Sequence, residues 1–318
     1  MEYIVITVIL LILLLAYLKL ASRFHIRDIP NERSSHTQVT LNGGGIIFYA
    51  GVLCTFLGNG FQYPYFFIGL TLITIVSFAD DISSVSEPLR LLVHFVAVAF
   101  LFIQLKMYNV SWYTFFFFSF VYVGFVNIYN FMDGINGMTV GYSLTAIGSF
   151  WYVNNYLHTF TDNSFLYVIA LSLGLLIPFN FRKRAICFVG DVGAVSMAFI
   201  LLFLLVKLIL GTADFSYFIL FAVYGVDGVL TIVHRLLLKE NILKAHRKHV
   251  YQILVNELKI SHVRVALFYL LLQALIFIGY IGLRSYKYWY FGGVIVVLSG
   301  AYVRFIGKYY KYTTPDKY

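Results

Sequence analysis

The amino-acid sequence predicts an all-α, polytopic membrane protein with about eleven transmembrane helices. Three observations predict this class: 61% of the 318 residues are hydrophobic, only 12% are charged, and the mean hydropathy is +0.84. A soluble chain of this length has too little interior to hide so much apolar surface. The apolar runs are continuous and lack the in-out alternation of a transmembrane β-barrel, so the spans are expected to be helices.

A helix needs about 20 apolar residues to cross a bilayer. Eleven stretches fit this requirement, several of them as short spans: about 3–20, 43–61, 64–79, 89–106, 112–129, 138–153, 164–180, 192–210, 215–233, 263–283 and 289–307. No basic residue precedes the first stretch, which is therefore expected to be a retained anchor. Residues 1–318 are expected to form a single integral membrane domain.

The distribution of basic residues predicts the orientation of these spans. With the N-terminus outside and the C-terminus in the cytoplasm, 19 of the 23 Lys and Arg residues lie on the inner side, three lie on the outer side, and Lys207 falls within a span. This bias obeys the positive-inside rule, so the net charge of +9 is attributed to topology and not to nucleic-acid binding. The cytoplasmic loops are expected at about 19–42, 80–90, 127–137, 181–191 and 234–264.

The segment Asn127–Met138 interrupts two apolar stretches with polar residues and glycines: Asn127, Asn130, Asp133, Gly134, Asn136 and Gly137. Polar groups in lipid cost several kcal/mol each unless they are satisfied. The segment is therefore expected at a membrane surface or beside a wet cavity. The alternative is a simple turn between two helices.

Two adjacent carboxylates, Asp80 and Asp81, close the third span. Like charges side by side are unfavourable unless a cation or strong donors offset them, so a Mg²⁺ site or a carboxylate base would explain the pair. The alternative is a solvated helix boundary. Aspartates at a helix C-terminus oppose the helix dipole, which weakens that alternative.

A third carboxylate, Asp191, lies between Gly190 and Gly193 just before the eighth span. Glycines let a backbone approach phosphates, and one carboxylate can hold a Mg²⁺ ion whose other ligands are waters and substrate oxygens. The basic run Arg182–Arg184 precedes it, either as phosphate contacts or as a topology signal.

The longest and most basic inner loop contains His246 and His249, which are expected on one face of a helix. A zinc site would need a third nitrogen or sulfur ligand nearby, so the imidazoles and Arg247 are expected to act as donors to a diphosphate. The alternative is an amphipathic helix that binds anionic lipid head groups.

The first inner loop leads from Arg27 through His36 to the glycine run Gly43–Gly45. The glycines either help to cradle an anion or allow close helix packing. The remaining histidines are interpreted as structural or solvated: His25, His94, His158 and His262.

Taken in order, these segments resemble the polyprenyl-phosphate N-acetylhexosamine-1-phosphate transferase family, glycosyltransferase family 4. The resemblance extends from Arg27 to Gln252 and is carried by four motifs: Asp80-Asp81, Asn130-Phe-Met-Asp-Gly-Ile-Asn-Gly137, Gly190-Asp-Val-Gly193 and His246-Arg-Lys-His249. The first loop and the His-Arg-x-His-x-Tyr-Gln ending are most similar to the O-antigen-initiating branch. Two departures are Asn136, where many relatives carry Asp, and Arg182–Arg184, where prolines are common.

The resemblance implies a role for each motif residue. Asp191 is implied as the Mg²⁺ ligand, with Mn²⁺ as the alternative ion. The implied catalytic residues are Asp80, Asp81, Asp133, His246 and His249. The implied substrate-binding residues are His36, Asn130, Asn136, Phe188 and Arg247, of which Phe188 matches an aromatic residue that stacks on uracil.

The resemblance also implies the reaction. A UDP-N-acetylhexosamine would transfer its sugar 1-phosphate to undecaprenyl or another polyprenyl phosphate, releasing UMP, as the first membrane step of bacterial surface polysaccharide synthesis such as O-antigen. The protein would lie in the bacterial inner membrane with its active site facing the cytoplasm. The sequence does not specify the hexosamine, and it leaves a homodimer open. The competing hypothesis is a non-enzymatic transporter or flippase of lipid-linked sugars.

Overall fold

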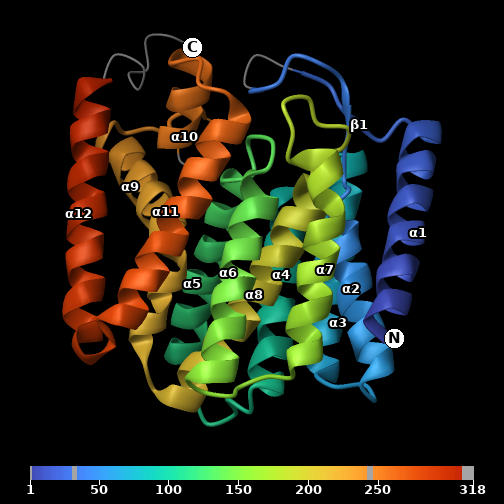
Figure 1. Ribbon diagram of the computed structural model, residues 1–318, viewed down its shortest axis with the longest axis horizontal. Coiled ribbons are helices and arrows are strands. Elements are labelled where there is room, and N and C mark those ends of the chain that lie inside the picture. Colours follow the sequence, from blue (N-terminus) through green and yellow to red (C-terminus); the bar gives the residue numbers. More distant parts are fainter. Residues whose placement is uncertain (1, 31–33, 242–245, 310–318) are drawn as a thin grey trace.

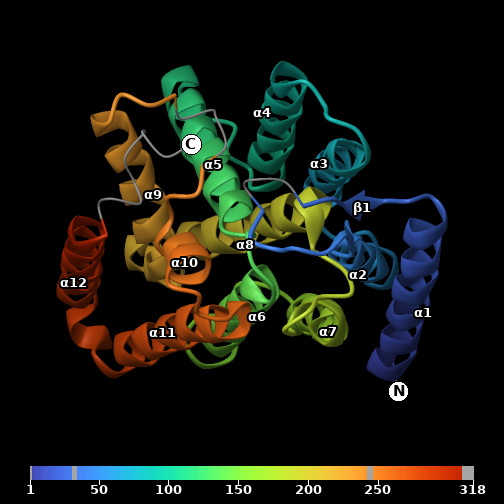
Figure 2. The ribbon, with the colours of Figure 1, turned by 90° about the horizontal axis from the view of Figure 1, so that it is seen from above.

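The helix α8 (Gly190–Thr212) lies at the centre of the molecule. In the computed structural model, which describes residues 2–30, 34–241 and 246–309, 89% of the most apolar stretch of α8 is buried, against 17% for α1 (Glu2–Arg23). Figure 2 shows α8 crossing the middle of a ring formed by the other long helices. A helix that is apolar on every side is expected in such a position.

Each of the eleven expected spans coincides with a helix in the described part of the chain. The remaining long helices are α2 (Ile46–Gly58), α3 (Pro64–Ile82), α4 (Glu87–Gln104), α5 (Trp112–Phe131), α6 (Met138–Tyr156), α7 (Asn163–Asn180), α9 (Ala222–Leu237), α11 (His262–Gly282) and α12 (Lys287–Lys308). Short elements complete the chain: the 3-10 helices η1 (Phe215–Phe221) and η3 (Arg284–Tyr286), the single turn α10 (Val250–Gln252) and the π-helical turn η2 (Ile253–Glu257).

Nine helices within the described residues are long and apolar enough to cross a membrane, two fewer than the sequence predicted. The helix α2 has only 13 residues, because the chain turns at Gly43–Gly45 before it begins. The helix α6 is more polar than a lipid-exposed span, and several of its polar side chains are buried: Thr139, Ser143, Ser149 and Asn154. Ser143, for example, is buried and shares a 2.6 Å hydrogen bond with Tyr129. The protein is a polytopic helical membrane protein.

The all-α prediction missed a small antiparallel ladder between β1 (Arg27–Asp28) and β2 (Thr40–Leu41). The strand β2 also forms a parallel bridge to Cys187, through which it reaches the segment before α8. Strands of two residues are too short to give an alternating sequence pattern, so the sequence offered no signal for them.

One end of the bundle gathers the connecting segments that carry polar residues. Figure 1 shows β1 and α10 at this end, whereas the N-terminal end of α1 lies at the opposite end. The helices α3, α5 and α7 finish here, and α4, α6 and α8 begin here (Figure 1). The last described helix, α12, also finishes at this end. The predicted side of the C-terminus concerns residues 310–318, which lie outside the described residues.

Close packing of α2 on α8 depends on two glycines. A Cβ atom on Gly45 would lie 2.3 Å from the Cα of Gly193, so a larger residue would force the helices apart. The backbone N–H groups of Gly44 and Gly45 donate to the carbonyls of Phe188 and Val189. Of the two interpretations of the glycine run, the structure supports close packing, because these N–H groups already have partners.

Candidate active site

A cavity of about 210 Å³ lies at the end of the bundle where the polar segments meet. Six of the predicted site residues line it: His36, Asn130, Asp133, Asn136, Phe188 and Asp191. They come from the first loop, the end of α5, the α5–α6 connection, the α7–α8 connection and the start of α8. The fold therefore brings together segments that are far apart in the sequence, as their polar character predicted.

A second cavity of about 210 Å³ adjoins the first. The two cavities share Ser35, His36, Asn136, Phe188 and His262. The second cavity is also lined by Lys183 and Arg184. The combined site thus has an acidic half, at Asp133 and Asp191, and a basic half. Such a division suits an elongated anionic ligand that binds together with a cation.

Asp81 anchors the N-terminus of α8. Its Oδ1 accepts hydrogen bonds from the backbone N–H of Asp191 at 2.9 Å and from Nδ2 of Asn42 at 2.8 Å. Its Oδ2 accepts the backbone N–H of Val192 at 3.0 Å. A carboxylate at this position satisfies orphan N–H groups and complements the positive end of the helix dipole. Asp81 therefore fixes the place at which Asp191 enters the site.

Gly190 allows this arrangement because its backbone has a φ of +75°. A Cβ atom at this position would lie 2.7 Å from Oδ2 of Asp81 and 2.7 Å from the backbone nitrogen of Gly43. Only glycine adopts this conformation at no steric cost while leaving the carboxylate in place. The glycine before Asp191 is thus explained by the contact with Asp81.

Asp80 has different partners from its neighbour. Its Oδ2 accepts from Nη1 of Arg90 at 2.7 Å, and its Oδ1 accepts from the backbone N–H of Val85 at 2.6 Å. Its side chain, like that of Asn130, also lies within hydrogen-bonding reach of the Asp191 carboxylate. The adjacent aspartates therefore have separate positions: Asp81 holds the backbone of α8, and Asp80 faces the side chain of Asp191.

Asp133 lies in the connection between α5 and α6 and is partly buried. Burial raises the pKa of Asp133 well above its ordinary value, the nearby Thr139 offsets this only in part, and the charges of Asp191 and Asp81 raise it further. Folding therefore disfavours the ionised form of this carboxyl group. The cost is absent at low pH and grows as the pH rises above the unfolded pKa of about 4.

This sign predicts a pH-dependent effect of Asp133→Asn on stability. In buffer without divalent ions at pH 8, the variant is expected to unfold at a temperature a few degrees higher than the wild type, since roughly 1 kcal/mol corresponds to about 2–4 °C. The difference between the two unfolding temperatures should disappear towards pH 4. Thermal unfolding in detergent measures it, and Asp162→Asn, at the N-cap of α7, serves as the control. Equal midpoints at pH 8 would contradict the assigned cost.

The carboxylate cluster fits a divalent cation. Asp80, Asp81, Asp133 and Asp191 bring four acidic groups together, and Arg90 forms an ion pair with one of them. In the described part of the chain, no three His, Cys, Asp or Glu side chains are arranged to hold a metal by themselves. Water or substrate oxygens would therefore complete the coordination shell, which is typical of Mg²⁺.

Asn136 presents a hydrogen-bond acceptor to the cavity. Its Nδ2 donates to the carbonyl of Arg182 at 3.0 Å, which fixes the orientation of the amide. Its Oδ1 is buried and has no hydrogen-bond partner among the described residues. Nearby, the ring of Phe188 packs edge-on against His36 with centroids 4.8 Å apart. A planar ligand with an N–H donor would satisfy the orphan oxygen.

Three residues of the site were missed or misinterpreted from the sequence. Asn180 lines the first cavity, and its Oδ1 accepts a hydrogen bond from the backbone N–H of Gly137. His262 had been interpreted as structural or solvated, but it lines both cavities and accepts the N–H of Asn136 on Nδ1. Gln252 also lines the cavity. Asn180 and His262 are the first or last residues of long helices, where they look like ordinary boundary residues.

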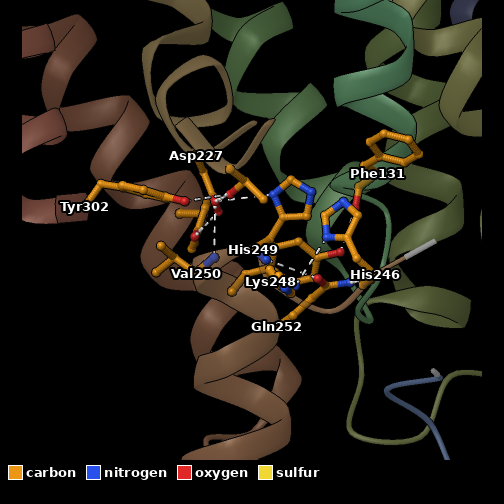
Figure 3. Close-up of polar contacts among 11 residues, drawn as sticks. Phe131, Asp227, His246, Lys248, His249, Val250, Gln252 and Tyr302 are labelled. Carbon is orange, nitrogen blue, oxygen red and sulfur yellow. Dashed lines mark hydrogen bonds and ion pairs between the residues drawn. The ribbon is translucent and has the colours of Figure 1, made fainter. Parts of the chain in front are cut away.

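The predicted histidine pair lies beside the cavity, not in its lining. The segment 246–249 is not helical, so the expected helical face is wrong. The rings still lie together, with centroids 4.9 Å apart, because the chain is folded back on itself by Gln252, which accepts the N–H of His249 and donates to the carbonyl of His246. Figure 3 shows the ring of His246 between those of His249 and Phe131.

The histidine segment is also joined to the walls of the cavity. The guanidinium of Arg247 donates to the carbonyl of Ser34 in the first loop. The hydroxyl of Tyr251 donates to the carbonyl of Phe131 at 2.6 Å, close to Gly134, where a Cβ atom would lie 2.2 Å from that hydroxyl. Residues 242–245, which precede this segment, lie outside the described residues.

Comparison with known proteins agrees with this geometry. The family model described as Glycosyl transferase family 4 matches residues 63–209, a range that contains Asp80, Asp133 and Asp191. One relative, "Probable undecaprenyl-phosphate N-acetylglucosaminyl 1-phosphate transferase" of Bacillus subtilis (strain 168), is 25% identical over 292 residues, covering 85% of this chain and 81% of the relative. Over residues 63–209 the chain is thus similar to glycosyl transferase family 4.

Proposed function

We propose that the protein transfers an N-acetylhexosamine 1-phosphate from a UDP-sugar to a polyprenyl phosphate and releases UMP, as the first membrane step of surface polysaccharide synthesis such as O-antigen. The observation that carries this proposal is the meeting of Asp80, Asp133 and Asp191 beside one polar cavity at one end of a membrane bundle. The name of the Bacillus subtilis relative describes the same reaction class, with N-acetylglucosamine as the sugar. UDP-N-acetylglucosamine and undecaprenyl phosphate are therefore the first substrates to test.

The proposed reaction joins two anions, so charge compensation is the central requirement. An oxygen of the lipid phosphate attacks the β-phosphorus of the UDP-sugar, the bond from that phosphorus to the bridging oxygen breaks, and UMP leaves. A bound Mg²⁺ would supply charge neutralisation at the diphosphate. Asp191 would hold it, with Asp80 and Asn130 beside the Asp191 carboxylate. Mn²⁺ has the same preference for oxygen ligands and is the alternative ion.

The lipid phosphate needs little help to lose its proton. A phosphate monoester loses its last proton near pH 6, so most of the acceptor is already the dianion at neutral pH. Asp81 accepts three hydrogen bonds from neighbouring groups, and Asp80 is paired with Arg90. We therefore assign neither aspartate of the pair as a dedicated base. Asp81 positions α8, and Asp80 supports the metal-binding side chain.

We assign the nucleotide to the part of the site between Asn136 and Phe188. The imide N–H of uracil is a donor, and the buried Oδ1 of Asn136 is an acceptor without a partner in the described chain. Asn in place of the Asp found in many relatives still supplies this acceptor. The ring of Phe188 would stack on the base, since every base offers a π-face.

The orientation follows from charge. We propose that all eleven helices cross the bacterial inner membrane, that the N-terminus lies outside, and that the site faces the cytoplasm. The basic residues Arg90, Lys183 and Arg247 lie at the site end, as the positive-inside rule requires.

The competing hypothesis of a transporter is not favoured. Transport sites are expected near the midplane and use ionisable groups that are free to bind a substrate. Lys207 and Asp227, which lie well inside the predicted spans 192–210 and 215–233, are both engaged by side chains: Lys207 donates to Tyr63, and Asp227 accepts from Tyr269 at 2.7 Å. The polar cavities lie at the end of the bundle instead.

The proposed function predicts that purified protein exchanges labelled UMP into UDP-N-acetylglucosamine. Exchange should require both a divalent ion and undecaprenyl phosphate, and chelation with EDTA should abolish it until Mg²⁺ is restored. A panel of UDP-sugars measured in the same assay identifies the preferred hexosamine. Exchange that persists without lipid acceptor, or no exchange with any UDP-sugar, would reject the proposal.

A further inference from the structure

The buried carboxylate of Asp227 in α9 has no part in the reaction proposed above, yet it collects four hydrogen bonds. Its Oδ1 accepts from the backbone N–H of Val250 at 3.1 Å, from Thr231 at 3.2 Å and from Nδ1 of His249 at 3.3 Å. Its Oδ2 accepts from Tyr269 at 2.7 Å. A buried charge is tolerated only with such compensation. Figure 3 shows Asp227 facing the ring of His249.

The contact with Asp227 fixes the ring of His249. An ionised carboxylate cannot donate, so Nδ1 of His249 carries the proton in its contact with Asp227. The backbone N–H of Gln252 also faces the His249 side chain, but it donates to the carbonyl of His249 at 3.0 Å. The side chain of His249 is 1% exposed, and its Nε2 is buried without a hydrogen-bond partner among the described residues. Neither His249 nor His246 lines a cavity, so the difference between them is one of exposure. Its surroundings are those of a packed structural group that has one fixed tautomer.

His246 has different surroundings, although the motif makes the two histidines look equivalent. It is partly exposed, and its ring lies between His249 and Phe131, with the centroid of Phe131 5.9 Å away (Figure 3). Its Nδ1 accepts the backbone N–H of Lys248 at 3.3 Å, so the proton of the neutral ring is on Nε2. Burial first, and then the neighbouring His249, Arg235 and Lys248, together lower the pKa of His246 to about 2. His246 is therefore a neutral Nε2–H donor.

Building on the proposed function, we propose that the two histidines have separate roles. Asp227 and His249 form a buried positioning pair that holds the segment 246–252, and His246 alone of the two meets a phosphate group of the substrate. Within the segment, Gln252 joins the backbone of His246 to that of His249, so the position of one ring sets the position of the other. The orienting of an imidazole by a buried carboxylate is a known way to fix its tautomer.

The first test compares substitutions of the two histidines. His246→Ala should lower kcat for UMP exchange about 100-fold, which is typical for loss of one donor to transition-state charge, with an unchanged unfolding midpoint. His249→Asn should stay within about five-fold of the wild type, because the amide nitrogen can replace Nδ1 as the donor to Asp227. Tyr302→Phe is the matched control. Its hydroxyl bonds Thr231 at 3.1 Å in the same network without touching either histidine, so activity should be unchanged.

The second test asks whether Asp227 acts through His249. Asp227→Leu removes every acceptor that faces Nδ1 of His249. It should lower kcat about 10- to 100-fold in the wild-type background, because the ring is then free to change tautomer or move. In the His249→Asn background, the same substitution should cost less than about three-fold further. Coupling of this kind separates a positioning residue from one whose loss merely loosens the fold, for which the effects would add.

Two results would overturn the proposal. One is a loss in His249→Asn as large as that in His246→Ala at an unchanged unfolding midpoint, because His249 would then contact the substrate. The other is additivity of Asp227→Leu and His249→Asn. If the wild type exchanges no UDP-sugar, the proposed function fails, and ¹⁵N-histidine NMR still decides the pair. Nδ1 of His249 should carry the proton in the wild type and should lose it, at least in part, to Nε2 in Asp227→Leu; an unchanged tautomer would overturn the pairing.

Discussion

Asp191→Asn is expected to reduce UMP exchange by about 1,000-fold while the protein remains folded. A metal ion at a transferring phosphoryl group stabilises the transition state by several kcal/mol, and each 1.4 kcal/mol is a factor of ten in rate. The amide keeps the shape of the side chain and cannot replace the charge that balances Mg²⁺. The backbone N–H of Asp191 still donates to Asp81, so the start of α8 should keep its position.

The matched control for Asp191→Asn is Asp162→Asn at the opposite end of the bundle. Asp162 caps α7 by accepting the N–H of Ser164, and asparagine caps as well as aspartate does. Asp162→Asn should show the wild-type unfolding midpoint, Asp191→Asn should be at least as stable as the wild type because it relieves repulsion in the cluster, and only Asp191→Asn should lose exchange. Raising the Mg²⁺ concentration should not restore it. Full exchange in Asp191→Asn would remove Asp191 from the metal site.

Asp81→Asn is expected to lower both stability and metal affinity. The asparagine has one acceptor oxygen in place of two, so at least one N–H at the start of α8 loses its partner. A hydrogen bond is worth roughly 0.5–1.5 kcal/mol. Burial and the charge of Asp191 raise the pKa of Asp81 to about 7, so loss of the charge offsets part of this cost at pH 8. A fall in the unfolding midpoint of a few degrees at most and a roughly 10-fold higher Mg²⁺ requirement should follow.

Asn42→Ala provides a graded comparison, because it removes the third donor to Asp81 and leaves the contact with α8 intact. Asn42→Ala should lower the unfolding midpoint and raise the Mg²⁺ requirement, as Asp81→Asn does, but by smaller amounts. The pH dependence of exchange at saturating Mg²⁺ should be unchanged in both variants. If Asp81→Asn instead keeps its midpoint and its Mg²⁺ requirement but loses one limb of the pH profile, Asp81 is a base and not an anchor.

The sequence predicted those features that follow from composition and from the position of polar groups between apolar stretches. Asp80, Asp133 and Asp191 could be predicted to meet because each lies at an end of a span on the same side. The roles within the Asp80-Asp81 pair could not be predicted. The two residues are chemically identical neighbours, and only the direction of each side chain assigns one to Arg90 and the other to the backbone of α8.

The remaining differences also have physical causes. A three-residue spacing between His246 and His249 predicts one helical face, but the hydrogen bonds of Gln252 and Asp227 hold this segment in a non-helical path. Those partners lie on other turns and another helix, so no local pattern reveals them. The stretch 138–153 was predicted to be a span, but α6 is not among the helices apolar enough to be one. The sequence does not show that polar residues such as Ser143 are satisfied in the interior, here by Tyr129.

The contacts between the first and last loops of the site set the order in which it can be assembled during synthesis. The carbonyl of Ser34 accepts a hydrogen bond from Arg247, and Ser35 forms hydrogen bonds with both Asn256 and His262. The wall of the cavity that holds His36 therefore gains these supports only after more than two hundred further residues have left the ribosome. A nascent chain that stops before Arg247 would contain all four acidic residues of the cluster without these supports. Growing chains should thus acquire substrate affinity late and abruptly, long after the first helices have entered the membrane.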